Sequence, residues 1–231
     1  KKDSFADPHT KKLVDNPGYL KDPTKIAQHV LEKSGDTHAN SVVVGRSAVL
    51  GIPEFNDEGT VAENAMTFSK ISHPNAETVA ACVTLAGVVS KIMLAKEEPD
   101  KHDPSAWISQ CVEHGKKMLE DEKSVGRFGK CVDESTTLED LDLSNNKDGM
   151  SVLGAALWAL RNTRDPSSIP TALHTLMMEG GDAICNVAAA GSLLGCAFGV
   201  RSLPKEWIRS VIHKPFLSEE VSELKNACNF V

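Results

Sequence analysis

The sequence predicts an all-α fold, because helix signals follow one another along the chain while the alternation typical of strands is scarce. Apolar residues recur at helical spacing, and several of these segments begin at a polar cap with proline and end at glycine. A chain of 231 residues can also bury a large core. We therefore expect a single domain over residues 1–231, a compact globule of orthogonally packed helices around a buried central helix rich in alanine and glycine.

The first clear helix lies between Asp22 and Lys33. Asp22 and Pro23 supply an N-cap and a proline at the first helical position, and Gly35 fits the left-handed residue that ends many helices. A second amphipathic helix is expected over residues 57–71, where apolar residues share one face.

The next segment is almost wholly apolar and predicts a helix that is buried on most sides. It starts near Pro74, where Ser72, His73 or Asn75 supplies the cap, and it continues to Met93.

The second half of the chain carries three further helix signals. Asp103 and Pro104 open the first, whose charged residues indicate a solvent-facing side. The second is strongly apolar over residues 149–161, and the third covers residues 168–178 and is ended by two glycines.

Residues 133–149 form an acidic segment that is rich in turn formers. Its carboxylates do not fall at the spacing of an EF-hand, and the sixth position of such a loop is not glycine, so the segment does not predict a calcium site. We expect a mobile surface connection.

One carboxylate, Asp182, lies between glycine and a long apolar run that extends to Val200. The run has about the length of a minimal membrane span, but Asn186, Ser192 and three glycines make it a poor one. The glycines recur at every fourth residue and would let another backbone approach one helix face. We therefore expect a fully buried central helix here. The three glycines are Gly191, Gly195 and Gly199.

Charge and cysteine usage exclude several classes of function. The chain has 25 basic and 32 acidic residues, a formal net charge of -7 and no stripe of basic and aromatic residues, so we expect no nucleic-acid partner and no membrane partner. The six cysteines lack paired metal-binding spacing, which argues against a structural zinc site, and their apolar surroundings indicate free thiols in a reducing, cytoplasmic setting. The polar N-terminal stretch carries no signal-peptide pattern.

Three stretches resemble the ADP-ribosylglycohydrolase family, which includes the dinitrogenase reductase-activating glycohydrolases and crystallin J1. "EGGDAICNVAAAGSLLGCAFG" followed by "SLPKEW" is similar to a signature in which a Gly-Asp-x-Asp-Ser/Thr motif opens an Ala/Gly-rich helix, with Asp182 at the first acidic position. "ISHPNAETVAACV" resembles a family helix start, with Ser72 and His73 in register. "SGDTHANSVVVGRSAVLGIP" resembles an Asn-Gly-x-x-Met-Arg segment followed by a Leu-Gly turn, with Arg46 in register.

The resemblance implies a site with two magnesium ions, held by a Thr-Asp-Asp cluster and by both acids and the hydroxyl of the later motif. The second acidic position is Ile184 here, the hydroxyl position is Cys185, and Asn-Gly has become Ser41 and Val42. Neither an aliphatic side chain nor a thiol suits a hard cation, and the chain contains no Thr-Asp-Asp. We therefore expect no catalytic residue, a vestigial metal ligand at Asp182, and no cofactor unless the ancestral activity survives with magnesium.

Asp182 also has a structural interpretation as the N-cap of the long helix. Cys185, close to the same helix start, is a candidate nucleophile, but no basic residue lies beside it in the sequence and Asp182 would oppose thiolate formation. His73 is expected to cap or to pack rather than to catalyse.

Two classes of function follow. The first is a degenerate family member that has a structural role, like crystallin J1, or that binds ADP-ribose or a nucleotide through Ser41, Arg46, Gly181 and Asp182, since glycines at a helix start can receive an anion. A homo-oligomer is expected if Lys1 is the true start of the protein. The alternative is an active hydrolase that removes ADP-ribose from modified proteins or small molecules.

Overall fold

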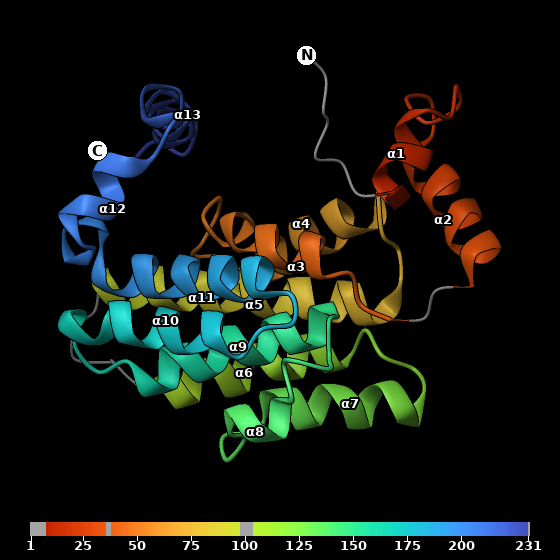
Figure 1. Cartoon of the computed structure of the whole chain (residues 1–231). Coiled ribbons are helices and arrows are strands. Elements are labelled where there is room, and N and C mark those ends of the chain that lie inside the picture. The colour runs from red at the N-terminus through yellow and green to blue at the C-terminus, as the bar shows by residue number, and fades with distance from the viewer. Residues whose placement is uncertain (1–7, 36–37, 98–103, 231) are drawn as a thin grey trace.

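The computed structural model describes residues 8–35, 38–97 and 104–230. These residues form α-helices and short 3-10 turns and no strand, so the all-α prediction is confirmed. The long helices of the body lie side by side, with α1 and α2 above one end and α12 and α13 above the other (Figure 1). The helices are α1 (Pro8–Val14), α2 (Pro23–Ser34), α3 (Ser41–Ser47), α4 (Glu58–Lys70), α5 (Ala76–Glu97), α6 (Pro104–Lys116), α7 (Glu122–Val132), α8 (Leu138–Leu141), α9 (Gly149–Asn162), α10 (Ile169–Met178), α11 (Ala183–Phe198), α12 (Lys205–Ser210) and α13 (Lys214–Ala227).

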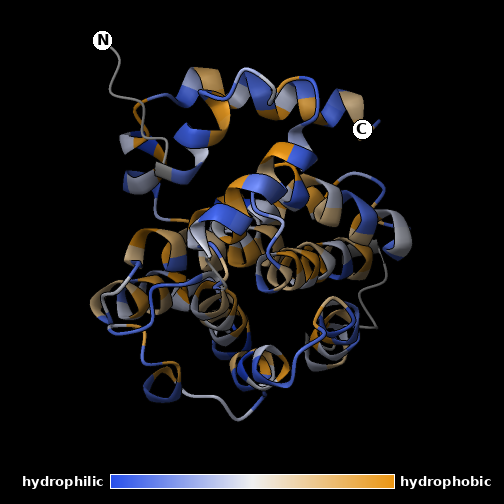
Figure 2. Cartoon of the chain, turned by 90° about the vertical axis from the view of Figure 1, so that its right-hand side faces the viewer, coloured by the Kyte–Doolittle hydropathy of each residue, from blue (hydrophilic) through white to orange (hydrophobic). Residues whose placement is uncertain are grey.

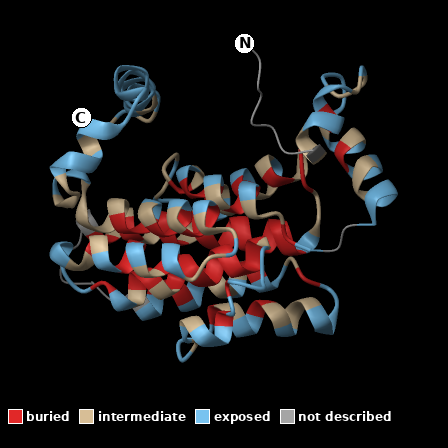
Figure 3. Cartoon of the chain, in the orientation of Figure 1, coloured by how far each residue is buried: buried red, intermediate tan, exposed pale blue. Residues whose placement is uncertain are grey.

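The core is built around α5 and α9, which are buried along most of their length (Figure 3). α5 packs against α3, α4, α6 and α9, and its near-continuous apolar sequence provides an apolar surface for each neighbour. The hydropathy colouring shows the same concentration of apolar residues inside the body (Figure 2). By length and composition α5 could cross a membrane. However, 78% of its most apolar 18-residue stretch is buried inside the protein, as in the core helix of a globular domain.

Several predicted helix starts and ends are confirmed. The Asp22 carboxylate accepts a hydrogen bond from the Lys25 backbone N–H at 3.1 Å, and Gly35 ends α2 with a φ of 65°. Of the three candidate caps for α5, Asn75 has the contact, because its Oδ1 accepts from the backbone N–H of Thr78 at 3.1 Å. Asp103, the predicted cap of α6, lies outside the described residues.

Residues 133–149 are more structured than a surface connection. They contain the single turn of α8, which begins with a reciprocal capping box between Thr137 and Asp140. Leu141 and Leu143 are buried and pack beneath α9 and α10 in a satellite core. The apolar leucines interleaved with the acids therefore anchor this segment to the body.

α11 differs from its prediction as a fully buried helix. One face is buried, including Cys185 and Asn186, while Ile184 is 85% exposed. The predicted close approach of a second backbone is wrong at all three glycines: within the described residues, a Cβ at Gly195 or Gly199 would meet no atom within 4 Å, and at Gly191 it would meet only the Leu173 side chain at 4.0 Å. Alanine and glycine make the sequence of this helix apolar, but such small side chains can also lie at the surface. The apolar sequence therefore predicted more burial than the structure shows.

Candidate functional site

The start of α3 meets the start of α11, and this junction holds two of the residues predicted from sequence. Ser41 donates a hydrogen bond from its hydroxyl to Asp182 Oδ2 at 2.5 Å. Asn40 caps α3 by accepting from the backbone N–H of Val43 at 3.1 Å. Asp182 stands at the N-cap position of α11, but its side chain makes no capping hydrogen bond, so its predicted capping role is wrong. The carboxylate instead turns across the junction toward Ser41.

Gly181 fixes the approach to this junction. Its φ is +66°, and a Cβ there would lie 1.8 Å from the backbone oxygen of Leu143. The chain entering α11 therefore runs directly against the segment between α8 and α9, at a distance that only glycine permits. Gly181, which was predicted to bind a ligand, therefore has a packing role in the structure.

A buried carboxylate lies on the other side of α3, at the start of α5. Glu77 is 3% exposed, and both of its carboxylate oxygens accept hydrogen bonds from Arg127 Nη1, at 2.9 and 2.8 Å. The Ser124 hydroxyl donates to Glu77 at 2.9 Å, and the backbone N–H of Ala39 donates to it at 3.3 Å. These donors compensate the loss of hydration that burial imposes on the carboxylate.

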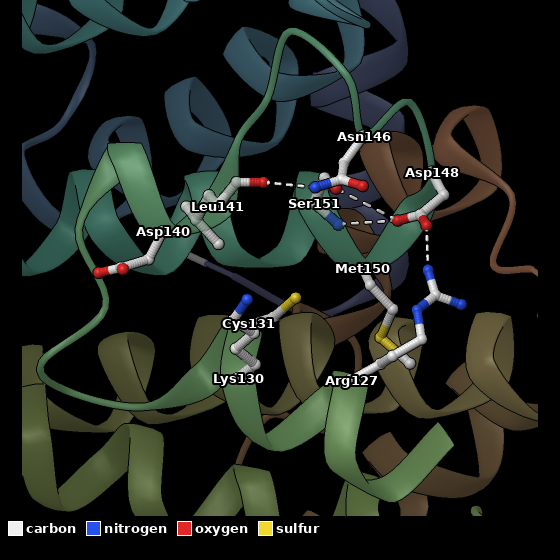
Figure 4. Close-up of a pocket in the computed structure, with 9 residues that line it drawn as sticks. All are labelled: Arg127, Lys130, Cys131, Asp140, Leu141, Asn146, Asp148, Met150 and Ser151. Atoms are coloured by element: carbon white, nitrogen blue, oxygen red, sulfur yellow. Dashed lines mark hydrogen bonds and ion pairs between the residues drawn. The ribbon is translucent and has the colours of Figure 1, made fainter. Parts of the chain in front are cut away.

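Arg127 extends this network to the start of α9. Its second terminal nitrogen pairs with Asp148, and Asp148 caps α9 by accepting from the backbone N–H of Ser151 at 3.0 Å (Figure 4). Asn146 closes the adjacent loop by donating to the backbone oxygen of Leu141 at 2.8 Å. The guanidinium thereby joins α5, α7 and α9, and it lines a cavity of about 180 Å³ between α7, α8 and the start of α9.

A larger and more open cavity of about 510 Å³ adjoins the first and shares Arg127 and Asp148 with it. Ser41 lies on its wall, which connects the cavity to the Ser41–Asp182 pair. Lys123 and Lys147 line the cavity and are exposed. The cavity is therefore a polar recess with three cationic side chains, one of which is already neutralised by two carboxylates.

The donor set at the α3–α11 junction does not fit a pair of magnesium ions. It offers the Asp182 carboxylate, the Ser41 hydroxyl and the Cys185 thiol, whereas magnesium requires several oxygen ligands in octahedral array. Within the described residues, no three His, Cys, Asp or Glu side chains are grouped closely enough to hold a metal ion. Ile184, at the position where the family pattern has its second acid, faces outward.

Cys185 lies in surroundings that suppress its reactivity. Burial, and next the neighbouring Asp182 carboxylate, raise the pKa of the Cys185 thiol to about 11. A thiol needs its thiolate form to act as a nucleophile, so this environment opposes the catalytic interpretation of Cys185.

We expect Asp182→Asn to increase the rate of iodoacetamide labelling at Cys185 several-fold at pH 8, because loss of the carboxylate lowers the thiol pKa and so increases the thiolate fraction. The rate is measured by peptide mass spectrometry, with labelling at Cys228 in the same sample as the internal reference. An unchanged ratio of the two rates would show that Asp182 does not influence Cys185.

The structure brings Ser41, Gly181 and Asp182 together, whereas Arg46 takes part in a different contact. Its guanidinium lies 5.4 Å from the centre of the Phe68 ring, on the side of α4. His73 is buried and stacks on His9 with ring centres 4.2 Å apart, so it packs, as predicted.

Arg127, Glu77 and Asp148 were missed by sequence reasoning. The signal for Glu77 was present, because an acid at the start of an otherwise apolar helix requires a partner when it is buried. The sequence does not indicate which of the 25 basic residues supplies that partner.

Comparison with known proteins supports the family resemblance. The family model described as ADP-ribosylglycohydrolase matches residues 8–229, nearly the whole chain. No curated protein and no solved structure gave a significant match.

Proposed function

The chain belongs to the ADP-ribosylglycohydrolase family, and from this premise we propose that it binds ADP-ribose or a related nucleotide without hydrolysing it. The observation that carries the proposal is the polar recess of about 510 Å³ beside the Ser41–Asp182 pair. Its volume falls in the range of small-molecule sites, and its lysines offer charge to a diphosphate. The family supplies the ligand class, since its members act on ADP-ribose linkages.

The residues of the recess, and Asp182 beside it, suit different parts of such a ligand. Lys123 and Lys147 stand at the open side, where the phosphates would retain partial hydration. Asp182 and Ser41 can accept and donate hydrogen bonds to ribose hydroxyls, as their side chains already do to each other. Arg127 is held by Glu77 and Asp148 and serves as a fixed part of the wall.

We infer that the protein does not hydrolyse the ligand because the side chains at the α3–α11 junction do not provide the ligands that two magnesium ions require. Hydrolysis at the anomeric carbon would need the charge and orientation that the family obtains from two magnesium ions. Ile184 cannot coordinate a cation, and Cys185 is a soft ligand that is held as a neutral thiol. A structural role like that of crystallin J1 would require the fold but would not require a ligand in the recess.

We expect calorimetric titration with ADP-ribose to show binding that is unchanged by millimolar magnesium. Lys147→Glu should weaken this binding at least tenfold, about 1.4 kcal/mol, because it places a negative charge at the proposed phosphate position. Lys25→Glu, which makes the same charge change on exposed α2, is the matched control and should leave binding unaltered.

The other outcomes separate the alternatives. Binding that requires magnesium, together with release of ADP-ribose from a modified protein, would favour an active hydrolase. No heat with or without magnesium would contradict ligand binding and leave the structural role.

A further inference from the structure

Within the described residues, α13 is not packed into the core of the protein. None of its 14 residues is buried, and all of them except the half-buried Leu224 are exposed (Figure 3). Its described attachment to the body lies beyond its C-terminal end, where the Phe230 and Phe55 rings have centres 5.8 Å apart. A helix of this length is only marginally stable in water unless one of its faces is covered.

The face of α13 that turns toward α12 forms one wall of an apolar groove of about 570 Å³. Trp207, Ile208 and Val211 line the groove from the α12 side, and Leu217 and Val221 line it from α13. Trp207 is 42% exposed and Val221 is 56% exposed, so the groove is open to solvent. Apolar surface of this kind on a soluble domain marks a contact site.

The face of α13 opposite the groove carries an aromatic ring and acidic side chains. Helical periodicity places Phe216 on the side away from the groove, together with Glu219, Glu220 and Glu223. Phe216 is 58% exposed and the three glutamates are exposed. The outer face therefore presents an aromatic ring surrounded by acids.

The groove face carries the opposite charge. Lys214 lines the groove, and Lys225 lies on the same side of the helix, seven residues after Ser218, another lining residue. An apolar groove flanked by two lysines complements an aromatic ring beside three glutamates in apolar character and in charge. α13 contributes to both halves of this match, and α12 completes the groove.

We propose that the occupant of the groove is the outer face of α13 from a second copy of this chain, with Phe216 of one copy seated between α12 and α13 of the next. The two surfaces lie on opposite sides of the helix, so the contact is head-to-tail and can add further copies. α13 is about 21 Å long and the six-residue α12 about 9 Å, so the groove and the outer face of α13 each present on the order of 200–300 Å². This size belongs to weak, reversible interfaces. The proposal does not depend on ligand binding at the polar recess.

Sedimentation analysis of the full chain over a range of concentrations tests the proposal. The wild-type protein is expected to associate reversibly, with the mean mass rising as concentration increases and falling as salt is added. Phe216→Asp removes the inserted ring, and Val221→Asp places a charge in the groove; each should reduce association at least tenfold. Leu20→Asp, at a 92% exposed leucine in the turn between α1 and α2, is the control and should associate like wild type.

Mixing the two defective variants gives the sharpest result. Val221→Asp retains an intact outer face and Phe216→Asp retains an intact groove, so an equimolar mixture should form a complex of two chains and no larger species. Far-ultraviolet circular dichroism of each variant checks that the helices remain.

Three results would overturn the proposal. One is a wild-type protein that stays monomeric at several hundred micromolar, and another is association that survives both substitutions. The third is a monomeric wild type that binds anionic lipid vesicles, a result that would assign the groove to a membrane surface and the basic residues of α12 to its headgroups.

Discussion

Gly181→Ala is expected to lower the free energy of unfolding by roughly 3–4 kcal/mol. The added Cβ would lie 1.8 Å from the Leu143 backbone oxygen, and a φ of +66° disfavours any residue with a Cβ. The segment between α8 and α9 would have to move away from the start of α11. Urea denaturation followed by circular dichroism measures the loss.

Gly180 is the matched control, because it differs from Gly181 chiefly in the space around it. Its φ is +77°, but a Cβ there would meet nothing within 4 Å. Gly180→Ala should therefore lower the free energy of unfolding only by the strain of a Cβ-bearing residue at positive φ, about 1–2 kcal/mol. Equal losses for the two variants would show that the contact with Leu143 contributes nothing to stability.

Arg127→Met is expected to destabilise the protein by about 3–5 kcal/mol, because it leaves the Glu77 carboxylate buried without its cationic partner. Asp148 loses the same partner, although its cap on α9 remains. Arg46→Met makes the same chemical change at an exposed arginine, where loss of the contact with Phe68 should cost about 0.5–1 kcal/mol.

The double variant Glu77→Met/Arg127→Met tests whether the two side chains act as a pair. Removing both charges abolishes the uncompensated carboxylate, so the double variant should be more stable than Arg127→Met alone. If the effects of the two single substitutions simply add, the ion pair is not the source of the loss.

The fold was largely predictable because helix signals are local. Each signal determines structure within a few residues of its own position in the sequence. Examples are the cap at Asp22, the glycine stop at Gly35 and the apolar run of α5. α3 was not predicted, since valine runs have low helix propensity and this helix depends on packing against α5, α9 and α11.

The site was predictable only in part, for a different physical reason. Asp182 stood out because a carboxylate beside an apolar run is unusual, but its partner Ser41 is 141 residues away in the sequence. The same holds for Glu77 and Arg127, which are 50 residues apart. Side-chain pairs at such separations follow from tertiary packing and leave no spacing pattern in the chain.

The hydrogen bond between Ser41 and Asp182 has a consequence for the order of folding. It closes a loop of most of the chain, and contacts of this separation form late because the entropy of loop closure must first be overcome. The pairing of Ser41 with Asp182 can therefore form only after α11 has docked against α3, whereas the wall of the polar recess contains no residue of α11. A ligand that contacts both the recess and Asp182 would therefore stabilise the docked position of α11.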